Sequence, residues 1–449
     1  MSNTETGNLQ AMRYGNGVTN LYGYDALNRL TNLVWNFGGT TRASFAYQLK
    51  RSGTRTNLNE TVGTSSRSYA WSYDSLYRLT NEVVSDLGNL GYAYDPVGNR
   101  TNRSGSLGSL GTQLIAYDTN DWVTTDTYDT NGNTTVSGGI TNHYDALNRL
   151  ISIGNGATNF LYDGDGNRVS KTKTFGANNE TTYFLIDDRN PSGFAQVLEE
   201  YQQTNDSAPG ILGRVYNYGL MLISQQQFDP NTLLPSTLSY YGFDGHGSVR
   251  FLTDANGSLT DTYTYDAFGN LITSASSGST PNVYLYSGQQ FDPDLGLYYN
   301  RARYLNTDTG RFWTSDTYTG NNEDPLSLHK YLYAECDPVD NDDPSGRDIG
   351  DALTAIQGIG SLMSFFIGNL SKILIAGAEV ALKRPSSAKF CVSSRAKPPT
   401  ISRVKTTHPL RRNTVLCSRR LAAHCGGERT QSESTTCDSG PVSAGLVQA

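Results

Sequence analysis

One short motif, Tyr-Asp followed within five residues by Asn, Arg or both, recurs along this 449-residue chain. From Tyr73 to Tyr162 successive copies lie 11 to 23 residues apart, which is the length of one β-hairpin. Repetition at this spacing predicts stacked hairpins that share one buried face, since a single hairpin is marginally stable. Copies begin at Tyr24, Tyr73, Tyr94, Tyr144, Tyr162 and Tyr265, and degenerate copies begin at Tyr117 and Tyr128.

Each position of the motif has a physical role in a hairpin. Alternating stretches such as Tyr92-Ala93-Tyr94 predict a strand with its tyrosines on one face and their hydroxyls near polar partners. The Asp at the strand end can accept backbone N–H groups of the following turn. Gly-Asn or Leu-Asn then supplies a residue that tolerates positive φ, and Arg-Leu-Thr starts the next strand. The motif therefore predicts an all-β fold of repeated hairpins.

These repeats resemble those of the RHS/YD-repeat family, and the resemblance is most specific after Tyr263. An ordered set of motifs there is similar to the RHS repeat-associated core, so that the resemblance covers roughly residues 10–347. The motifs are Tyr263-Thr264-Tyr265-Asp266-Ala267-Phe268-Gly269-Asn270, Tyr286-Ser287-Gly288-Gln289-Gln290-Phe291-Asp292, Gly296-Leu297-Tyr298-Tyr299-Asn300-Arg301-Ala302-Arg303-Tyr304, Gly310-Arg311-Phe312-Trp313-Thr314-Ser315-Asp316 and Asp343-Pro344-Ser345-Gly346.

The resemblance implies that the repeats form part of a spiralling YD-repeat shell around a C-terminal toxin. A composition of 46 Gly, 29 Tyr and 17% charged residues suits such turn-rich β-structure and is not typical of an α/β enzyme. Complete shells need a longer chain, and no basic-then-apolar leader follows Met1. We therefore expect a portion of a larger RHS gene product, or a short cassette left by recombination.

Four regions are expected: YD/RHS repeats over 1–260, the RHS repeat-associated core over 261–347, a helical apolar segment over 348–383 and a basic, disordered tail over 384–449. The stretch from Ala352 to Ser371 is uncharged and long enough to span a bilayer, but its Gly and polar residues favour a helical hairpin packed on the shell or on a partner. We regard a membrane span as the weaker alternative.

The tail holds eleven Lys and Arg against three Asp and Glu. A disordered tail without a defined function is the first interpretation, weak electrostatic binding of nucleic acid is the second, and a Cys/His metal module or toxin tip is the third. No Cys-x-x-Cys pair is present, so the sequence predicts no metal site and no cofactor.

The resemblance also implies a catalytic site, an aspartyl autoprotease formed by Arg303, Asp316 and Asp343 that cuts just after Asp-Pro-x-Gly-Leu. One carboxylate would activate water and the other, protonated, would polarise the scissile carbonyl. The chain departs from the family pattern with Arg347 in place of Leu, with Thr317 in place of Pro and with a longer interval between the two aspartates. The alternative is that both aspartates cap turns in a plug that closes the shell.

The leading function is encapsulation or presentation of a C-terminal toxin-like segment in interbacterial competition. One alternative is a cell-surface or extracellular adhesion protein that binds carbohydrate on exposed Tyr and Trp, namely Trp35, Trp71, Trp122 and Trp313. Another is an autoprotease that acts only on its own chain. The expected partners are other parts of an RHS shell, or a toxin-complex or secretion partner, with carbohydrate as the alternative. The resemblance favours a secreted or cell-surface location.

Overall fold

The computed structural model describes residues 1–4, 7–205, 210–276 and 280–347. All of them belong to one compact unit. The helical segment expected over 348–383 and the basic tail expected over 384–449 lie outside the described residues.

The first part of the chain forms an eleven-stranded antiparallel sheet in which strand order follows the sequence. Each strand pairs with its sequence neighbours, as expected when every connection is a hairpin. The strands are β1 (Ser2–Asn3), β2 (Leu9–Arg13), β3 (Thr19–Tyr24), β4 (Leu30–Phe37), β5 (Thr40–Leu49), β6 (Arg55–Val62), β7 (Ser65–Tyr73), β8 (Leu79–Val84), β9 (Gly88–Tyr94), β10 (Arg100–Leu107) and β11 (Gln113–Leu114).

A fourteen-stranded sheet of the same kind follows and continues to Ser276, beyond the expected start of the core region at residue 261. Its strands are β12 (Thr127–Tyr128), β13 (Thr134–Ser137), β14 (Ile140–Tyr144), β15 (Leu150–Ile153), β16 (Thr158–Tyr162), β17 (Arg168–Phe175), β18 (Asn178–Asp187), β19 (Gln196–Thr204), β20 (Ile211–Tyr218), β21 (Leu222–Phe228), β22 (Pro235–Phe243), β23 (Val249–Thr253), β24 (Leu259–Tyr265) and β25 (Leu271–Ser276).

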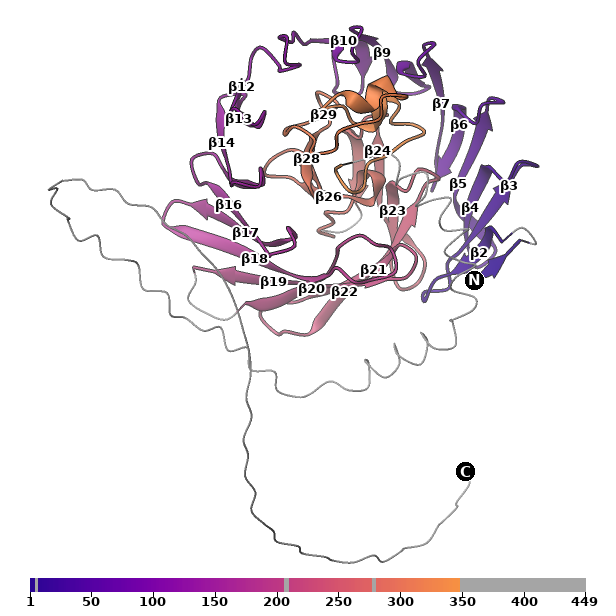
Figure 1. Cartoon of the computed structure of the whole chain (residues 1–449). Coiled ribbons are helices and arrows are strands. Elements are labelled where there is room, and N and C mark those ends of the chain that lie inside the picture. Colours follow the sequence, from indigo (N-terminus) through magenta and orange to yellow (C-terminus); the bar gives the residue numbers. More distant parts are fainter. Residues whose placement is uncertain (5–6, 206–209, 277–279, 348–449) are drawn as a thin grey trace, which may run out of the picture. The chain divides into compact units, whose positions relative to one another are not determined.

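The last described segment, which we call the plug (residues 286–347), holds a four-stranded sheet and short 3₁₀ turns. Within the described unit, Figure 1 shows the plug strands among the strands of the two larger sheets. Its elements are η1 (Tyr286–Gly288), β26 (Gln290–Asp292), β27 (Leu297–Asn300), β28 (Arg303–Asn306), β29 (Arg311–Phe312), η2 (Pro325–Leu328) and η3 (Ala334–Cys336). The prediction of an all-β fold is confirmed.

The Tyr-Asp motifs form the turns as predicted. The Oδ1 atom of Asp74 accepts the N–H groups of Leu76 and Arg78, both at 2.9 Å, while Nε of Arg78 donates to Oδ2 at 2.7 Å. The residue between them, Tyr77, has a φ of 62°. In Gly-Asn-Arg copies the Asn side chain takes the role of the Arg, as in the 2.9 Å bond between Asn99 Nδ2 and Asp95 Oδ2.

In the six full copies of the motif, the tyrosine links its hairpin to the preceding strand. It is the last residue of its strand, and its hydroxyl donates to the carbonyl of the first residue of the strand before. A row of such bonds runs along the sheets and satisfies the hydroxyls, because a buried tyrosine hydroxyl needs a hydrogen-bond partner. The pairs are Tyr24 with Leu9, Tyr73 with Arg55, Tyr94 with Leu79, Tyr144 with Thr134, Tyr162 with Leu150 and Tyr265 with Val249.

We expect Tyr94→Phe to lower the free energy of unfolding by about 0.5–1.5 kcal/mol, because the substitution removes only the 2.7 Å bond from the hydroxyl to the Leu79 carbonyl. Urea denaturation followed by tryptophan fluorescence measures the change. Tyr77→Phe is the matched control, since the Tyr77 side chain is 55% exposed and should change stability little. Equal effects of the two substitutions would contradict a role of the bond.

None of the four tryptophans is among the exposed residues, although the carbohydrate-binding alternative expected them to be. Trp35 is 1% exposed, and its indole N–H donates to the Phe243 carbonyl inside the main hydrophobic core. Trp122 is partly buried and stacks on Tyr128 at a centroid distance of 4.9 Å. The expectation is wrong for Trp35 because a sheet with a partner layer on one face buries its largest side chains there.

No helix within the described ranges is long and apolar enough to cross a membrane. The uncharged stretch 352–371, on which the weaker membrane alternative rested, lies outside those ranges.

Candidate active site

The plug brings the three predicted catalytic side chains together. Arg303 begins β28 with its side chain 6% exposed. Its Nη2 atom lies 2.7 Å from Oδ2 of Asp316 and 3.1 Å from Oδ2 of Asp343. The guanidinium also stacks over the Phe312 ring, 3.7 Å from its centroid, so one face of the cation is shielded from water. One arginine nitrogen therefore joins two carboxylates that are 27 positions apart in sequence.

Both aspartates also cap turns. The second oxygen of Asp343 accepts the hydroxyl of Ser345 at 3.0 Å and the N–H groups of Gly346 and Arg347 at 2.8 and 3.1 Å. Oδ1 of Asp316 accepts the N–H of Tyr318 at 2.9 Å. The turn-cap interpretation thus describes one oxygen of each aspartate, while Arg303 occupies the other.

Burial controls the protonation of this group. Burial raises the pKa of Asp316 and of Asp343, and the charge of Arg303 only partly offsets it. Burial lowers the pKa of Arg303 against the opposing effect of the two carboxylates. The adjacent Asp342 has its pKa raised to about 7, first by burial and then by the charge of Asp343. One guanidinium between two buried carboxyl groups favours a state in which the pair retains a proton.

The peptide bond between Gly346 and Arg347 lies against this cluster. Its carbonyl accepts a bond from Nε of Arg303, and its N–H donates to Oδ1 of Asp343 at 3.1 Å. Gly346 has a φ of 70°, and a Cβ there would lie 2.2 Å from the Asn300 carbonyl oxygen. Only glycine fits this position, because a side chain would meet both the positive φ and the neighbouring backbone.

Sequence reasoning missed two residues beside Arg303. Asn300 donates through Nδ2 to the Asp343 carbonyl at 2.8 Å, and Nη1 of Arg301 donates to the Pro344 carbonyl. Both belong to the same Tyr-Asn-Arg-Ala-Arg-Tyr motif that supplied Arg303. Their proximity to Arg303 in sequence was the available signal, but nothing in the motif indicated that they face residues 343 and 344.

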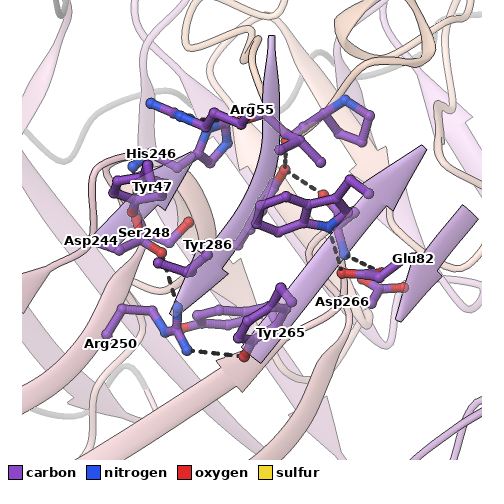
Figure 2. A pocket seen from close by; sticks show the side chains of 16 residues that line it. Tyr47, Arg55, Glu82, Asp244, His246, Ser248, Arg250, Tyr265, Asp266 and Tyr286 are labelled. Atoms are coloured by element: carbon purple, nitrogen blue, oxygen red, sulfur yellow. Dashed lines mark hydrogen bonds and ion pairs between the residues drawn. The ribbon is translucent and has the colours of Figure 1, made fainter. Parts of the chain in front are cut away.

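A second candidate is a cavity between the eleven-stranded sheet, the fourteen-stranded sheet and the plug (Figure 2). Its walls include Arg55, Glu82, His246, Arg250 and Asp266. The cavity volume is about 60 Å³, whereas sites for small organic ligands are roughly 300–1,000 Å³. The cavity is well below that size, so it carries no ligand assignment.

Two other groups of polar residues lie in repeat turns. His246 follows the Asp244 cap, and its Nε2 lies 3.1 Å from the Ser287 hydroxyl, where it joins a repeat turn to η1 of the plug. The segment that begins at Asp163 is a hairpin turn, in which Oδ1 of Asp163 accepts the N–H groups of Asp165 and Asn167. No group of His, Cys, Asp and Glu in the described part of the chain is arranged to hold a metal ion.

Comparison with known proteins agrees with this fold. The family model described as Teneurin YD-shell matches residues 24–339. The tRNA3(Ser)-specific nuclease WapA of Bacillus spizizenii is 30% identical over 359 residues, which cover 76% of this chain and 14% of that protein. Toxin protein Tse5 of Pseudomonas aeruginosa is 26% identical over 357 residues, covering 76% of this chain and 24% of Tse5.

Among solved structures, the crystal structure of TcdB2-TccC3-Cdc42 matches with a TM-score of 0.66 and 19% identity, covering 79% of this chain and 20% of that chain. This likeness supports the fold alone. The chain spans only a minor part of each of these longer proteins. The YD-shell match extends over most of the sequence and coincides with the hairpin repeats and the plug, so this chain belongs to the teneurin YD-shell family of RHS/YD-repeat proteins.

Proposed function

We propose that this chain is the closing portion of a YD shell, which presents residues 348–449 as a toxin-like cargo in interbacterial competition and cuts the chain beside Arg347. The observation that carries the proposal is the contact of Arg303 with Asp316, Asp343 and the Gly346 carbonyl at the end of the plug. Two relatives, one named as a tRNA nuclease and one as a toxin, support the proposal that the cargo is toxin-like. The partners are then the remainder of a longer shell or a toxin-complex subunit.

The chemistry is hydrolysis of one peptide bond, either Gly346–Arg347 or Arg347–Asp348. The ionised carboxylate takes a proton from a water molecule, whose oxygen attacks the carbonyl carbon. The protonated carboxyl group donates a hydrogen bond to the carbonyl oxygen and then supplies the proton that the leaving amine needs. Arg303 holds one carboxylate ionised and stabilises negative charge on the carbonyl oxygen. Asp343, with three hydrogen bonds on its second oxygen, is the member better suited to remain ionised.

The experiment is intact-mass measurement and N-terminal sequencing of the purified chain beside Asp316→Asn. We expect the parent to yield a new N-terminus at Arg347 or Asp348, and we expect Asp316→Asn to remain an intact chain of 49.0 kDa. The two N-termini distinguish the two candidate bonds. An intact chain in both samples, after prolonged incubation at pH 5, 7 and 9, would count against cutting and would leave the plug a structural closure.

A further inference from the structure

Four consecutive residues of the plug hairpin bind four consecutive carbonyl groups before Arg347. Nδ2 of Asn300 donates to the Asp343 carbonyl at 2.8 Å, and Arg301 donates to the next carbonyl, that of Pro344. The remaining two bonds run from the Ala302 N–H to Ser345 O, at 3.2 Å, and from Arg303 Nε to Gly346 O. The turn formed by residues 343–346 is thus bound through each of its four backbone carbonyl groups.

The hairpin that makes these contacts is strained at one position. Residues 301 and 302 connect β27 to β28, and Arg301 adopts a φ of 56°, a region that costs non-glycine residues energy. The same Nη1 atom of Arg301 also donates to Gln289 Oε1, and the guanidinium lies over the Phe194 ring. A glycine would relieve the strain but could not reach Pro344, so the arginine is needed for its contacts and not for the turn.

A second feature is the buried amide of Asn300. The residue is 1% exposed, and its Oδ1 atom has no hydrogen-bond partner among the described residues. An unpaired buried acceptor costs stability. The amide of Asn300 has this orientation because it places Nδ2 within hydrogen-bond distance of the Asp343 carbonyl.

The contacts with residues 343–347 require particular side chains at some of these positions and not at others. Asp343 is recognised through its carboxylate, and Gly346 is required because no Cβ fits beside the Asn300 carbonyl. The side chain of Arg347, in contrast, is exposed, and only its backbone N–H is bound.

From these observations we infer that Asn300 and Arg301 are positioning residues. Together with Ala302 and Arg303 they form a backbone clamp that holds residues 343–346 as a peptide ligand of the catalytic group. The clamp requires Gly346 and accepts any side chain at position 347, so Arg347 in place of Leu is compatible with cutting. It binds only residues before Arg347, and it therefore retains the new C-terminal end after the cut. The inference rests on the proposed function, and it adds which residues around the cut the plug requires.

The first test compares cutting rates of full-length variants by mass spectrometry. Arg301→Met keeps the aliphatic part of the side chain but removes its donors. We expect about tenfold slower cutting, the effect of losing roughly the one hydrogen bond to the Pro344 carbonyl. Arg301→Lys restores a donor and should recover most of the rate. We expect Gly346→Ala to abolish cutting and Arg347→Leu to change it less than about twofold. Arg149→Met, at a partly exposed repeat turn, is the matched control.

The second test does not require cutting, so it separates the clamp from the proposed function. In the uncut Asp316→Asn chain, we expect the amide of Ala302 to be protected from hydrogen exchange and to lose protection on adding Arg301→Met or Gly346→Ala. The amide of Phe312, which bonds Tyr331 O in the same plug, should stay protected and reports that the plug remains folded. Fast exchange at Ala302 in the single variant would overturn the clamp, as would equal cutting by Arg301→Met and the parent.

Discussion

Replacing Arg168 by Met is expected to destabilise the folded chain by roughly 3–5 kcal/mol, the usual cost of removing one partner of a buried ion pair. The Arg168 side chain is 1% exposed and lies 2.5 Å from Oδ2 of Asp292. It also donates to Gln290 and to the Tyr304 hydroxyl. The bonds join β17 of the large sheet to β26 and β28 of the plug, so their loss should weaken the attachment of the plug.

The loss of Arg168 leaves Asp292 in an unfavourable state. Burial alone would raise the pKa of Asp292, but Arg168 and Lys171 overcome this effect and hold it below the ordinary value. Without Arg168 the buried carboxylate has Lys171 as its remaining cation. Because the folded pKa is lowered, the stability that Asp292 contributes is present above its unfolded pKa and is lost as the pH falls through the folded value.

Urea denaturation of Arg168→Met, followed by tryptophan fluorescence, measures the effect. Arg29→Met is the matched control: Arg29 pairs with Asp25 at a repeat turn where both side chains are partly exposed, so about 0–1 kcal/mol is expected. The double variant Arg168→Met with Asp292→Leu should recover much of the loss, since the unpaired charge is then absent. A double variant as unstable as the single one would mean that packing, and not the charge, accounts for the effect.

Glu82→Gln is expected to make the chain more stable than the parent at pH 9 and less stable at pH 5. Glu82 is fully buried on β8, where its carboxyl group accepts the Ala267 N–H at 2.9 Å and the Trp71 indole N–H at 3.2 Å. Burial, and then the charge of Asp266, raises the pKa of Glu82 to about 8. Figure 2 shows the two acidic side chains next to each other at the cavity.

The direction of the pH effect follows from this shift. Between the ordinary value of 4.5 and about 8, the folded chain binds a proton at Glu82 that the unfolded chain has released. The contribution of Glu82 to stability is therefore full below pH 4.5, falls as the pH rises, and becomes a constant penalty above about pH 8, on the order of a few kcal/mol. Glutamine does not titrate, but its amide nitrogen would face one of the two N–H donors at a cost of about 1–3 kcal/mol.

Urea midpoints of the parent and of Glu82→Gln at pH 5, 7 and 9 check this prediction. Asp337 and Asp342, whose pKa values burial also raises, are present in both proteins, so the difference between the two curves reports Glu82. Parallel curves over the whole range would show that Glu82 is ionised in the folded chain at pH 5, contrary to the prediction.

The cluster of Arg303 with two aspartates in the plug shows how much of a site the sequence can predict. The resemblance predicted a catalytic role for Arg303, Asp316 and Asp343, and the structure places these three side chains in contact. The turn formed by Asp343 could be predicted from the sequence Asp-Pro-x-Gly. Asn300 and Arg301 were missed because their partners are backbone carbonyls about 43 residues away, and a carbonyl carries no sequence signal. Trp35 was placed on the surface because the repeat pattern marks a sheet face without saying whether a second layer covers it.

The sequence by itself determined the hairpin repeats, their Asp caps and the positions with positive φ, because each depends on contacts within about five residues along the chain. Only the tertiary structure decided which distant charges meet. Arg168 reaches Asp292 across 124 positions, and Arg250 reaches Glu60 across 190. The first pair joins the fourteen-stranded sheet to the plug, and the second joins the two larger sheets to each other. Both depend on how successive strands twist, and twist accumulates over many strands without a local pattern that specifies its sum.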